Sequence, residues 1–290
     1  MKKNGFISSA LLYGMLALFL VVMMSTLAIL GNRKLSMDKL KENALNNIQY
    51  GYAQTENIYA LYDGLQPPND DVWKDQSGNG HDATLVNFAS TSYTDRHLVF
   101  NGMNSYLDTG FKASDLGQTF TISAILNLQN ASKSRGIFGY YSPTDKAGVY
   151  AYIKQTADDT VASFCYYNTS SEEVCADVSV NNTLYPLLNQ TVQLTIVMQG
   201  GQGIDVYLND AHFVHRADTK NIKFHVDNLI FGNSNIDNTN LFRGNLYNLT
   251  IYKSALSLED VQKNFQINTE KYQIIGWQKN FTKIYFLIIS

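Results

Sequence analysis

The feature that most constrains the fold of this chain is a long series of short apolar runs that begins near residue 57. Each run alternates apolar and polar residues or is briefly apolar throughout, and clusters of Gly, Asn, Asp and Ser separate the runs, as in FTISAILNL, GVYAYIK, VQLTIVMQ and NLYNLTIY. Short runs with a period of two and regular turn signals are typical of strands in a sandwich or barrel. The sequence therefore predicts an all-β, two-sheet antiparallel sandwich in residues 57–272.

The composition agrees with a folded β domain. The 290 residues include 19 Tyr and 15 Phe, which favour half-buried pleated surfaces. Only four prolines are present, which argues against a disordered chain. The formal net charge is -3, so we expect no nucleic-acid partner, because such a partner requires a basic face.

The amino-terminal end has a different character. Residues 4–32 contain no charged residue, and residues 10–24 are almost wholly apolar. A helix needs about 20 apolar residues to cross a bilayer, whereas the apolar part of a signal peptide has about 7–15. We therefore expect residues 1–32 to form a transmembrane anchor, with a cleaved signal peptide as the alternative. Basic residues flank both sides of this run, so they do not decide its orientation.

An amphipathic stripe follows the predicted anchor. Apolar residues recur every three or four positions in residues 33–56, at Met37, Leu40, Ala44, Ile48 and Tyr52. This spacing predicts a helical stalk between the anchor and the β domain.

A second helix is predicted after the last strand. Ser257 and Asp260 have the spacing of a capping box, and Leu258, Val261 and Phe265 then fall on one helix face. The tail at residues 273–290 ends in KIYFLIIS, which is apolar but too short to cross a bilayer. Its role is unknown from the sequence.

The chain has two cysteines, Cys165 and Cys175, on either side of a polar segment at residues 168–172. If that segment is a hairpin turn, the two cysteines oppose each other closely enough to form a disulfide. Such a bond contributes about 2–3 kcal/mol of stability and indicates an oxidising compartment. Two buried thiols are the alternative. Together with the large polar body, the cysteines favour an extracellular carboxy-terminal domain on a single-pass protein of the cell membrane.

The segment DQSGNG begins at Asp75 like a calcium loop, with oxygen-bearing side chains at alternate positions and then a glycine. An EF-hand is excluded, because Val86 stands at the twelfth position and the flanking segments are predicted strands. Two interpretations remain: a tight turn, or a weak calcium site with Asp75 and Asn79 as ligands. No cofactor is required by either.

The sequence gives little support to catalysis, and we expect that the protein is not an enzyme. Glycan-cleaving enzymes need a pair of carboxylates at a fixed separation, whereas Glu172 and Glu173 are adjacent and would point to opposite faces of a strand. His212 and His215 are three residues apart, which also predicts opposite sides of a strand rather than a shared metal.

Tyrosines are dense along the middle strands, at Tyr140, Tyr141, Tyr150 and Tyr152. A tyrosine ring offers an apolar face with a polar tip, which suits stacking on a sugar or contact with a protein. The alternative is that these side chains simply cover the sheet.

With these pieces in order, residues 57–265 resemble the laminin G-like, or concanavalin A-like, jelly-roll family. The motifs that carry the resemblance are IYALYDG, DQSGNGHDATL, LVFNGMNSYLDTG, FTISAIL, DVYLNDAHF and GNLYNLTIYKSALSLEDV. The resemblance implies a jelly roll and a sugar- or protein-binding module of a surface protein. Some relatives bind calcium through the DQSGNG loop and acids on other strands, but here Asn101, Asn104 and Asn248 stand at positions of those acids.

The first 50 residues weakly resemble a type IV pilin-like segment. Lys3, Gly5 and Phe6 stand near a processing site of that kind, between Gly5 and Phe6, before a long apolar helix. Asn4 separates Lys3 from Gly5, and Ala10 replaces the usual glutamate.

Taken together, the sequence predicts a membrane-anchored, adhesin-like surface module that binds a glycan or a cell-surface protein without catalysis. A pilin-like subunit, whose amino-terminal helix assembles into a surface fibre, is the main alternative. A glycan-cleaving enzyme is the third.

Overall fold

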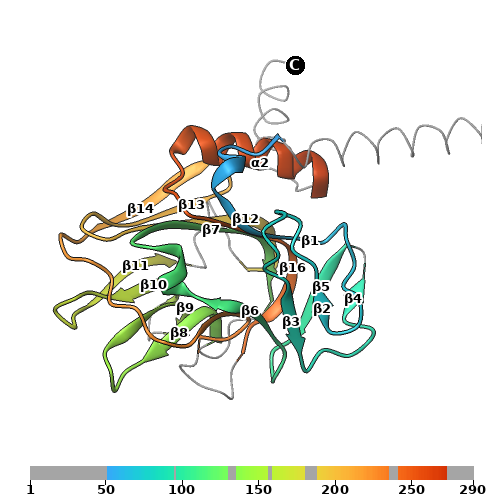
Figure 1. Cartoon of the computed structure of the whole chain (residues 1–290), viewed down its shortest axis with the longest axis horizontal. Helices are drawn as coiled ribbons and strands as arrows, with labels where there is room; N and C mark the ends of the chain where they lie inside the picture. The colour runs from blue at the N-terminus through green and yellow to red at the C-terminus, as the bar shows by residue number, and fades with distance from the viewer. Residues whose placement is uncertain are drawn as a thin grey trace, which may run out of the picture. The chain divides into compact units, whose positions relative to one another are not determined.

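A computed structural model of the chain describes residues 51–94, 96–129, 135–155, 159–179, 188–234 and 241–272. The chain divides into two compact units, Met1–Gly51 and Tyr52–Ser290. The second unit is a sandwich of two antiparallel sheets (Figure 1), which confirms the predicted fold class. The predicted anchor, all of the stalk before Gly51, and the tail at 273–290 lie outside the described residues. No helix in the described ranges has the length and apolar character to cross a membrane.

The first sheet has β16 near its centre, paired with β7 along its length, with β5 over its first half and with β1 over its second half. From one edge of the sheet to the other, its strands are β14 (Ala211–Ala217), β13 (Gly203–Leu208), β12 (Thr191–Gln199), β7 (Thr119–Leu128), β16 (Arg243–Tyr252), β5 (His97–Asn101) and β4 (Tyr93–Thr94). The eighth strand, β1 (Ile58–Asp63), pairs with β16.

The second sheet also has eight strands. In order they are β11 (Glu173–Ser179), β10 (Thr160–Tyr167), β9 (Ala147–Gln155), β8 (Arg135–Ser142), β15 (Asn228–Phe231), β6 (Tyr106–Lys112), β3 (Ala83–Val86) and β2 (Val72–Trp73). Two short 3-10 helices, η2 (Thr55–Asn57) and η3 (Ala113–Leu116), complete the elements before β7.

The main core lies between the two sheets, where alternate side chains of each strand meet. On β7 the inward residues are Phe120, Ile122, Ala124, Leu126 and Leu128, all buried. Aromatic rings from the two sheets pack against each other in this core. The ring centroid of Phe100 in the first sheet lies 5.9 Å from that of Phe231 in the second sheet. The period of two in the sequence therefore reflects one buried face for each strand.

Helix α2 (Leu258–Tyr272) covers the outer face of the first sheet (Figure 1). Its predicted capping box is confirmed, because Ser257 Oγ accepts a bond from the Asp260 N–H at 3.2 Å and the Asp260 carboxylate accepts one from the Ser257 N–H at 2.9 Å. The predicted apolar face is only partly correct. Val261 is buried, but Leu258 is 42% exposed.

Instead, α2 buries a polar side, which we call the helix-anchoring network. Lys271 forms an ion pair with Asp63 of β1, and both side chains are almost fully buried. The Tyr272 hydroxyl donates to the same carboxylate at 2.5 Å. The Asn268 amide donates to Gln193 Oε1 of β12 at 2.6 Å. Further bonds in the network are Tyr52 Oη to Asn268, the Ala53 N–H to Asn264, and the Asn264 amide to Tyr252. These partners satisfy the buried polar groups of the helix.

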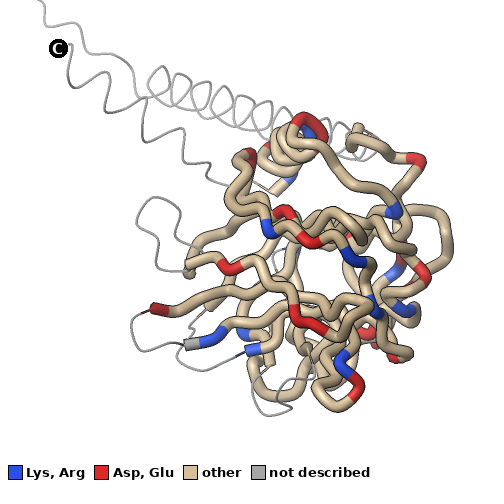
Figure 2. Tube along the Cα trace, turned by 90° about the vertical axis from the view of Figure 1, so that its left-hand side faces the viewer, with Lys and Arg blue, Asp and Glu red and all other residues tan. Residues whose placement is uncertain are grey.

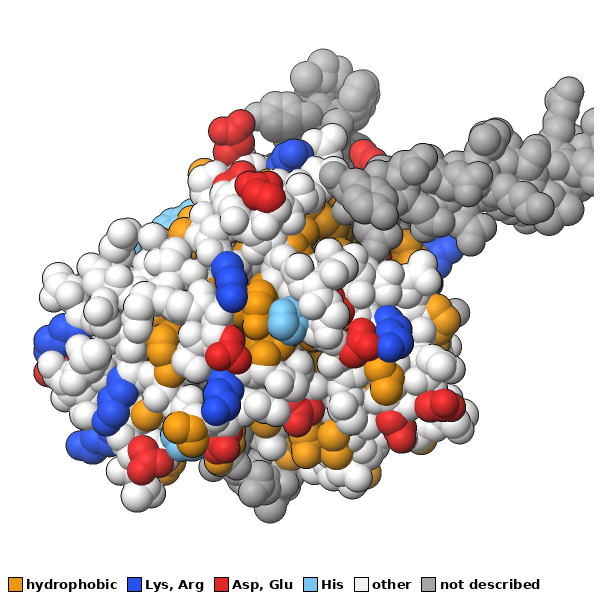
Figure 3. Space-filling view, in the orientation of Figure 1, with side chains coloured by type: hydrophobic (Ala, Val, Ile, Leu, Met, Phe, Trp, Pro, Cys, Tyr) orange, Lys and Arg blue, Asp and Glu red, His pale blue; other side chains and the backbone are white. Residues whose placement is uncertain are grey.

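Charged residues of both signs are interspersed along the chain rather than gathered in one block (Figure 2). On the face shown in Figure 3, hydrophobic side chains reach the surface only in small separate groups between charged and polar ones. Among the described residues, the large hydrophobic side chains that are exposed are Met103, Val226 and Leu258.

Candidate functional site

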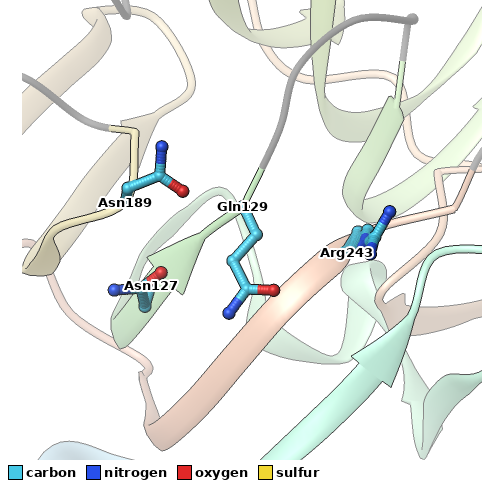
Figure 4. Close-up of a pocket in the computed structure, with 4 residues that line it drawn as sticks. All are labelled: Asn127, Gln129, Asn189 and Arg243. Carbon is cyan, nitrogen blue, oxygen red and sulfur yellow. The ribbon is translucent and has the colours of Figure 1, made fainter.

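A depression of about 350 Å³ lies at one end of the first sheet and is lined by Asn127, Gln129, Asn189 and Arg243 (Figure 4). We call it the amide–arginine pocket. Asn127 stands near the end of β7, Gln129 directly follows β7, Asn189 lies in the turn before β12, and Arg243 begins β16. In Figure 4, Gln129 lies between the two asparagines and Arg243.

Backbone hydrogen bonds hold these segments together. The Gln129 N–H donates to the Arg243 carbonyl at 2.9 Å, and the Asn189 N–H donates to the Leu128 carbonyl at 2.7 Å. Asn189 has a φ of 57°, in the left-handed region that asparagine tolerates better than most residues. The pocket is therefore built on the ends of paired strands rather than on a long loop.

The polar groups of the pocket are not used by the described part of the chain itself. No side chain of Asn127, Gln129, Asn189 or Arg243 has a hydrogen bond or ion pair to another described residue. Three amides supply both donors and acceptors, and the guanidinium supplies five donors. Such a surface can form hydrogen bonds with a ligand that carries several hydroxyl groups.

Three of the four tyrosines that the sequence singled out lie together on the outer face of the second sheet. Tyr141, Tyr150 and Tyr152 form a cluster with Tyr167, with ring centroids 4.6 Å apart for Tyr141 and Tyr150 and 6.0 Å apart for Tyr150 and Tyr152. Cys165 and Cys175 lie in the same cluster and form a disulfide across β10 and β11.

This tyrosine cluster satisfies most of its own polar groups. Tyr150 is fully buried, and its hydroxyl donates to Glu173. Burial and the Glu173 carboxylate raise the pKa of Tyr150 well above its usual value. Burial also raises the pKa of Tyr167, to about 12. Only Tyr141 and Tyr152 keep partly exposed rings, so the cluster offers a small aromatic surface.

Tyr140 does not belong to that cluster. Its ring stacks on His225 with centroids 4.5 Å apart, and the His225 ring nitrogens lie 3.1 and 3.2 Å from Asp145 and Asp227. The structure therefore separates Tyr140 from the other three tyrosines with which the sequence grouped it.

The Asp75 turn uses its carboxylate internally. Asp75 Oδ1 accepts bonds from the Leu61 and Ser77 N–H groups at 2.9 and 2.8 Å, and Oδ2 accepts from Ser77 Oγ at 2.7 Å and the His81 N–H at 3.0 Å. The Asn79 amide donates to the Ile58 carbonyl at 2.8 Å. These bonds fit the tight-turn interpretation, because each carboxylate oxygen already has two donors.

The other acidic and cysteine groups do not assemble a metal site in the described ranges. Cys165, Glu173 and Cys175 are the one close set of this kind there, but the two sulfurs are bonded to each other. Glu172 accepts a bond from Asn168 and pairs with Lys220, so it lies apart from Glu173, which binds Tyr150.

The expectation that His212 and His215 point to opposite sides of a strand is wrong. His212 Nε2 lies 2.8 Å and His215 Nδ1 2.9 Å from the same oxygen, Asp205 Oδ1. The β13–β14 register shifts between Val206 and Tyr207, and a bulge of this kind re-aims side chains that simple alternation would separate.

Sequence reasoning did not find the residues of the amide–arginine pocket. Asn127 and Arg243 are more than 100 positions apart, and only the pairing of β7 with β16 brings them together. No motif marks them. The available signal was indirect: Arg243 is the one charged residue in the last strand, RGNLYNLTIY.

A known protein family matches the middle and later part of this sequence. Residues 101–262, more than half of the chain, match a family model described as the concanavalin A-like lectin/glucanases superfamily, laminin G type. No curated protein matches the sequence.

Solved structures share the fold at low sequence identity. The botulinum neurotoxin serotype D ligand binding domain, solved in complex with N-acetylneuraminic acid, is 12% identical with a TM-score of 0.55, over 73% of this chain and 51% of that one. The Trypanosoma rangeli sialidase, solved with sialic acid, is 13% identical with a TM-score of 0.54, over 75% of this chain and 34% of that one. The chain thus spans about half or less of these proteins, and at this identity the similarity shows the fold alone.

Proposed function

The chain belongs to the concanavalin A-like lectin/glucanases superfamily, and from that premise we propose that it binds a glycan, without catalysis, in the amide–arginine pocket. The observation that carries the proposal is a set of polar side chains in the pocket that have no side-chain partner among the described residues: Asn127, Gln129, Asn189 and Arg243.

Sugar hydroxyls are both donors and acceptors, so they match side-chain amides well. The pocket volume of about 350 Å³ falls in the range of small-ligand sites. The two solved structures compared above carry sialic acids, which supports a glycan as the kind of partner. Retaining and inverting glycan cleavage both need two carboxylates, and the lining residues in the described part of the chain supply none.

We propose that the β domain is displayed outside the cell on a single-pass anchor formed by residues 1–32. The disulfide between Cys165 and Cys175 supports an oxidising location.

The pilin-like alternative stays a prediction. Amino-terminal sequencing of the native chain distinguishes the two, because a mature chain that begins at Phe6 indicates pilin-like processing and an intact Met1 indicates a plain anchor.

The experiment that tests glycan binding compares Gln129→Ala with Gln202→Ala in the full chain on a glycan array. Gln202 lies in the exposed β12–β13 turn, away from the pocket lining. Gln129→Ala should weaken glycan binding by about two- to tenfold or more, because it removes one or two hydrogen bonds of about 0.5–1.5 kcal/mol each. Gln202→Ala should leave glycan binding unchanged. Equal binding by both variants and the unmodified chain would rule out the pocket as the site.

A further inference from the structure

Two arginine side chains approach the same glycine, Gly102, next to the amide–arginine pocket. Arg135 begins β8 in the second sheet, and Arg243 begins β16 in the first. Both flank Gly102: a Cβ atom placed on Gly102 would lie 2.8 Å from Arg243 Cβ and 2.9 Å from Arg135 Nη1. Gly102 also has a φ of 74°. A glycine at this position therefore permits the close approach of both side chains.

Arg135 is an unusual buried cation. It is 9% exposed, and its Nη1 donates to the Leu241 and Gly102 carbonyls at 2.9 and 3.1 Å. Its Nε is buried and has no hydrogen-bond partner among the described residues. Burial lowers the pKa of Arg135, and the charge of Arg243 lowers it further.

The described part of the chain supplies no anion to offset these two charges. None of the ion pairs there includes Arg135 or Arg243. A buried charge without an opposite charge is destabilising, and two adjacent cations repel each other. An arrangement of this kind favours binding of an anion from outside the chain.

We infer that the pocket selects glycans that carry a negatively charged group, which pairs with the guanidinium of Arg243 while buried Arg135, on the other strand beside Gly102, adds a second positive charge nearby. This inference rests on the proposed glycan-binding function. The amides of Asn127, Gln129 and Asn189 would then bind neutral hydroxyls of the same ligand. Arginine forms two parallel hydrogen bonds with a carboxylate, and a sulfate group offers similar oxygens, so both chemistries fit.

The test measures binding of 3′-sialyllactose, 3′-sulfated lactose and lactose to the full chain in detergent micelles. The variants are Arg243→Gln and Arg243→Lys, and Arg216→Gln, an exposed position on β14, is the matched control. We expect at least one acidic sugar to bind about tenfold more tightly than lactose, as a charge-assisted pair would give. Arg243→Gln should remove that preference, Arg243→Lys should keep part of it, and Arg216→Gln should keep all of it.

The comparison between the two acidic sugars identifies the source of the charge, carboxylate or sulfate. Equal binding of lactose and both acidic sugars would overturn the inference while leaving the proposed function intact. A preference for acidic sugars that survives in Arg243→Gln would do the same. Failure of all three sugars to bind would overturn the inference, and absence of binding to every glycan on the array would overturn the proposed function as well. Arg243 is exposed, so its variants should fold even if changes at buried Arg135 do not.

Discussion

The helix-anchoring network and the amide–arginine pocket are both rich in polar side chains, but they use them in opposite ways. Under α2, Asn268 binds Gln193 and Tyr52, and Lys271 pairs with Asp63. In the pocket, Gln129 and Arg243 have no side-chain partner among the described residues. The first region uses polar groups to hold the chain together, and the second leaves them available.

This difference in side-chain pairing indicates which polar residues are candidates for function. A buried polar group with all its partners inside the protein contributes to stability and specificity of the fold. A cluster of donors and acceptors without partners in a depression contributes little to the stability of the fold and is a candidate binding site. The Asp75 turn belongs with the first region, although its sequence looks more like a ligand site than the pocket does.

The largest effect is expected for Lys271→Met. The substitution leaves the Asp63 carboxylate buried, with the Tyr272 hydroxyl and the Leu65 N–H as its remaining donors, so the free energy of unfolding should fall by about 3–5 kcal/mol. Urea unfolding of the full chain measures it. Lys74→Met is the control, because its pair with Asp82 is 61% and 36% exposed and should contribute less than about 1 kcal/mol. Similar losses in both variants would contradict the account.

Asp75→Ala is expected to lower the free energy of unfolding by about 2–3 kcal/mol, since the turn loses a charged acceptor of four hydrogen bonds. Asp70→Asn, at an exposed position with a φ of 52°, should change it little. Calcium should not raise the melting temperature of the unmodified chain. A calcium-dependent rise that Asp75→Ala abolishes would restore the metal-site interpretation.

Ser257→Ala should cost about 1 kcal/mol, because it removes the side-chain acceptor at the start of α2. Ser90→Ala, in an exposed loop, is the matched control. Thermal unfolding of the two variants gives the comparison. No difference between them would mean that the cap does not stabilise the helix.

The smallest effect on stability is expected in the pocket. Asn127→Ala and Gln129→Ala should each change the free energy of unfolding by less than about 0.5 kcal/mol, while glycan binding weakens. Asn189 needs a different substitution, to Gly, because its φ of 57° strains alanine. If Asn127→Ala or Gln129→Ala destabilises the domain as much as Ser257→Ala does, these amides are structural and the division fails.

The sequence predicted features that depend on nearby residues. Alternating runs identified the strands, the Ser257–Asp260 spacing identified the helix start, and the spacing of Cys165 and Cys175 placed the two cysteines across a hairpin.

Features that depend on topology were not predictable. The pocket needs β7, β12 and β16 to meet, the shared His212 and His215 contact needs a register shift, and the polar side of α2 needs Asp63 and Gln193 beneath it.

The central claim is that the four side chains of the amide–arginine pocket, which have no partner in the described ranges, bind the glycan. The most direct test is photo-crosslinking of the full chain with a diazirine-bearing sialyllactose probe, followed by mass-spectrometric mapping of the modified residues. The account predicts crosslinks at or beside Asn127, Gln129, Asn189 and Arg243. Crosslinks that fall instead on the tyrosine cluster, at Tyr141 or Tyr152, would contradict it and move the binding site to the second sheet.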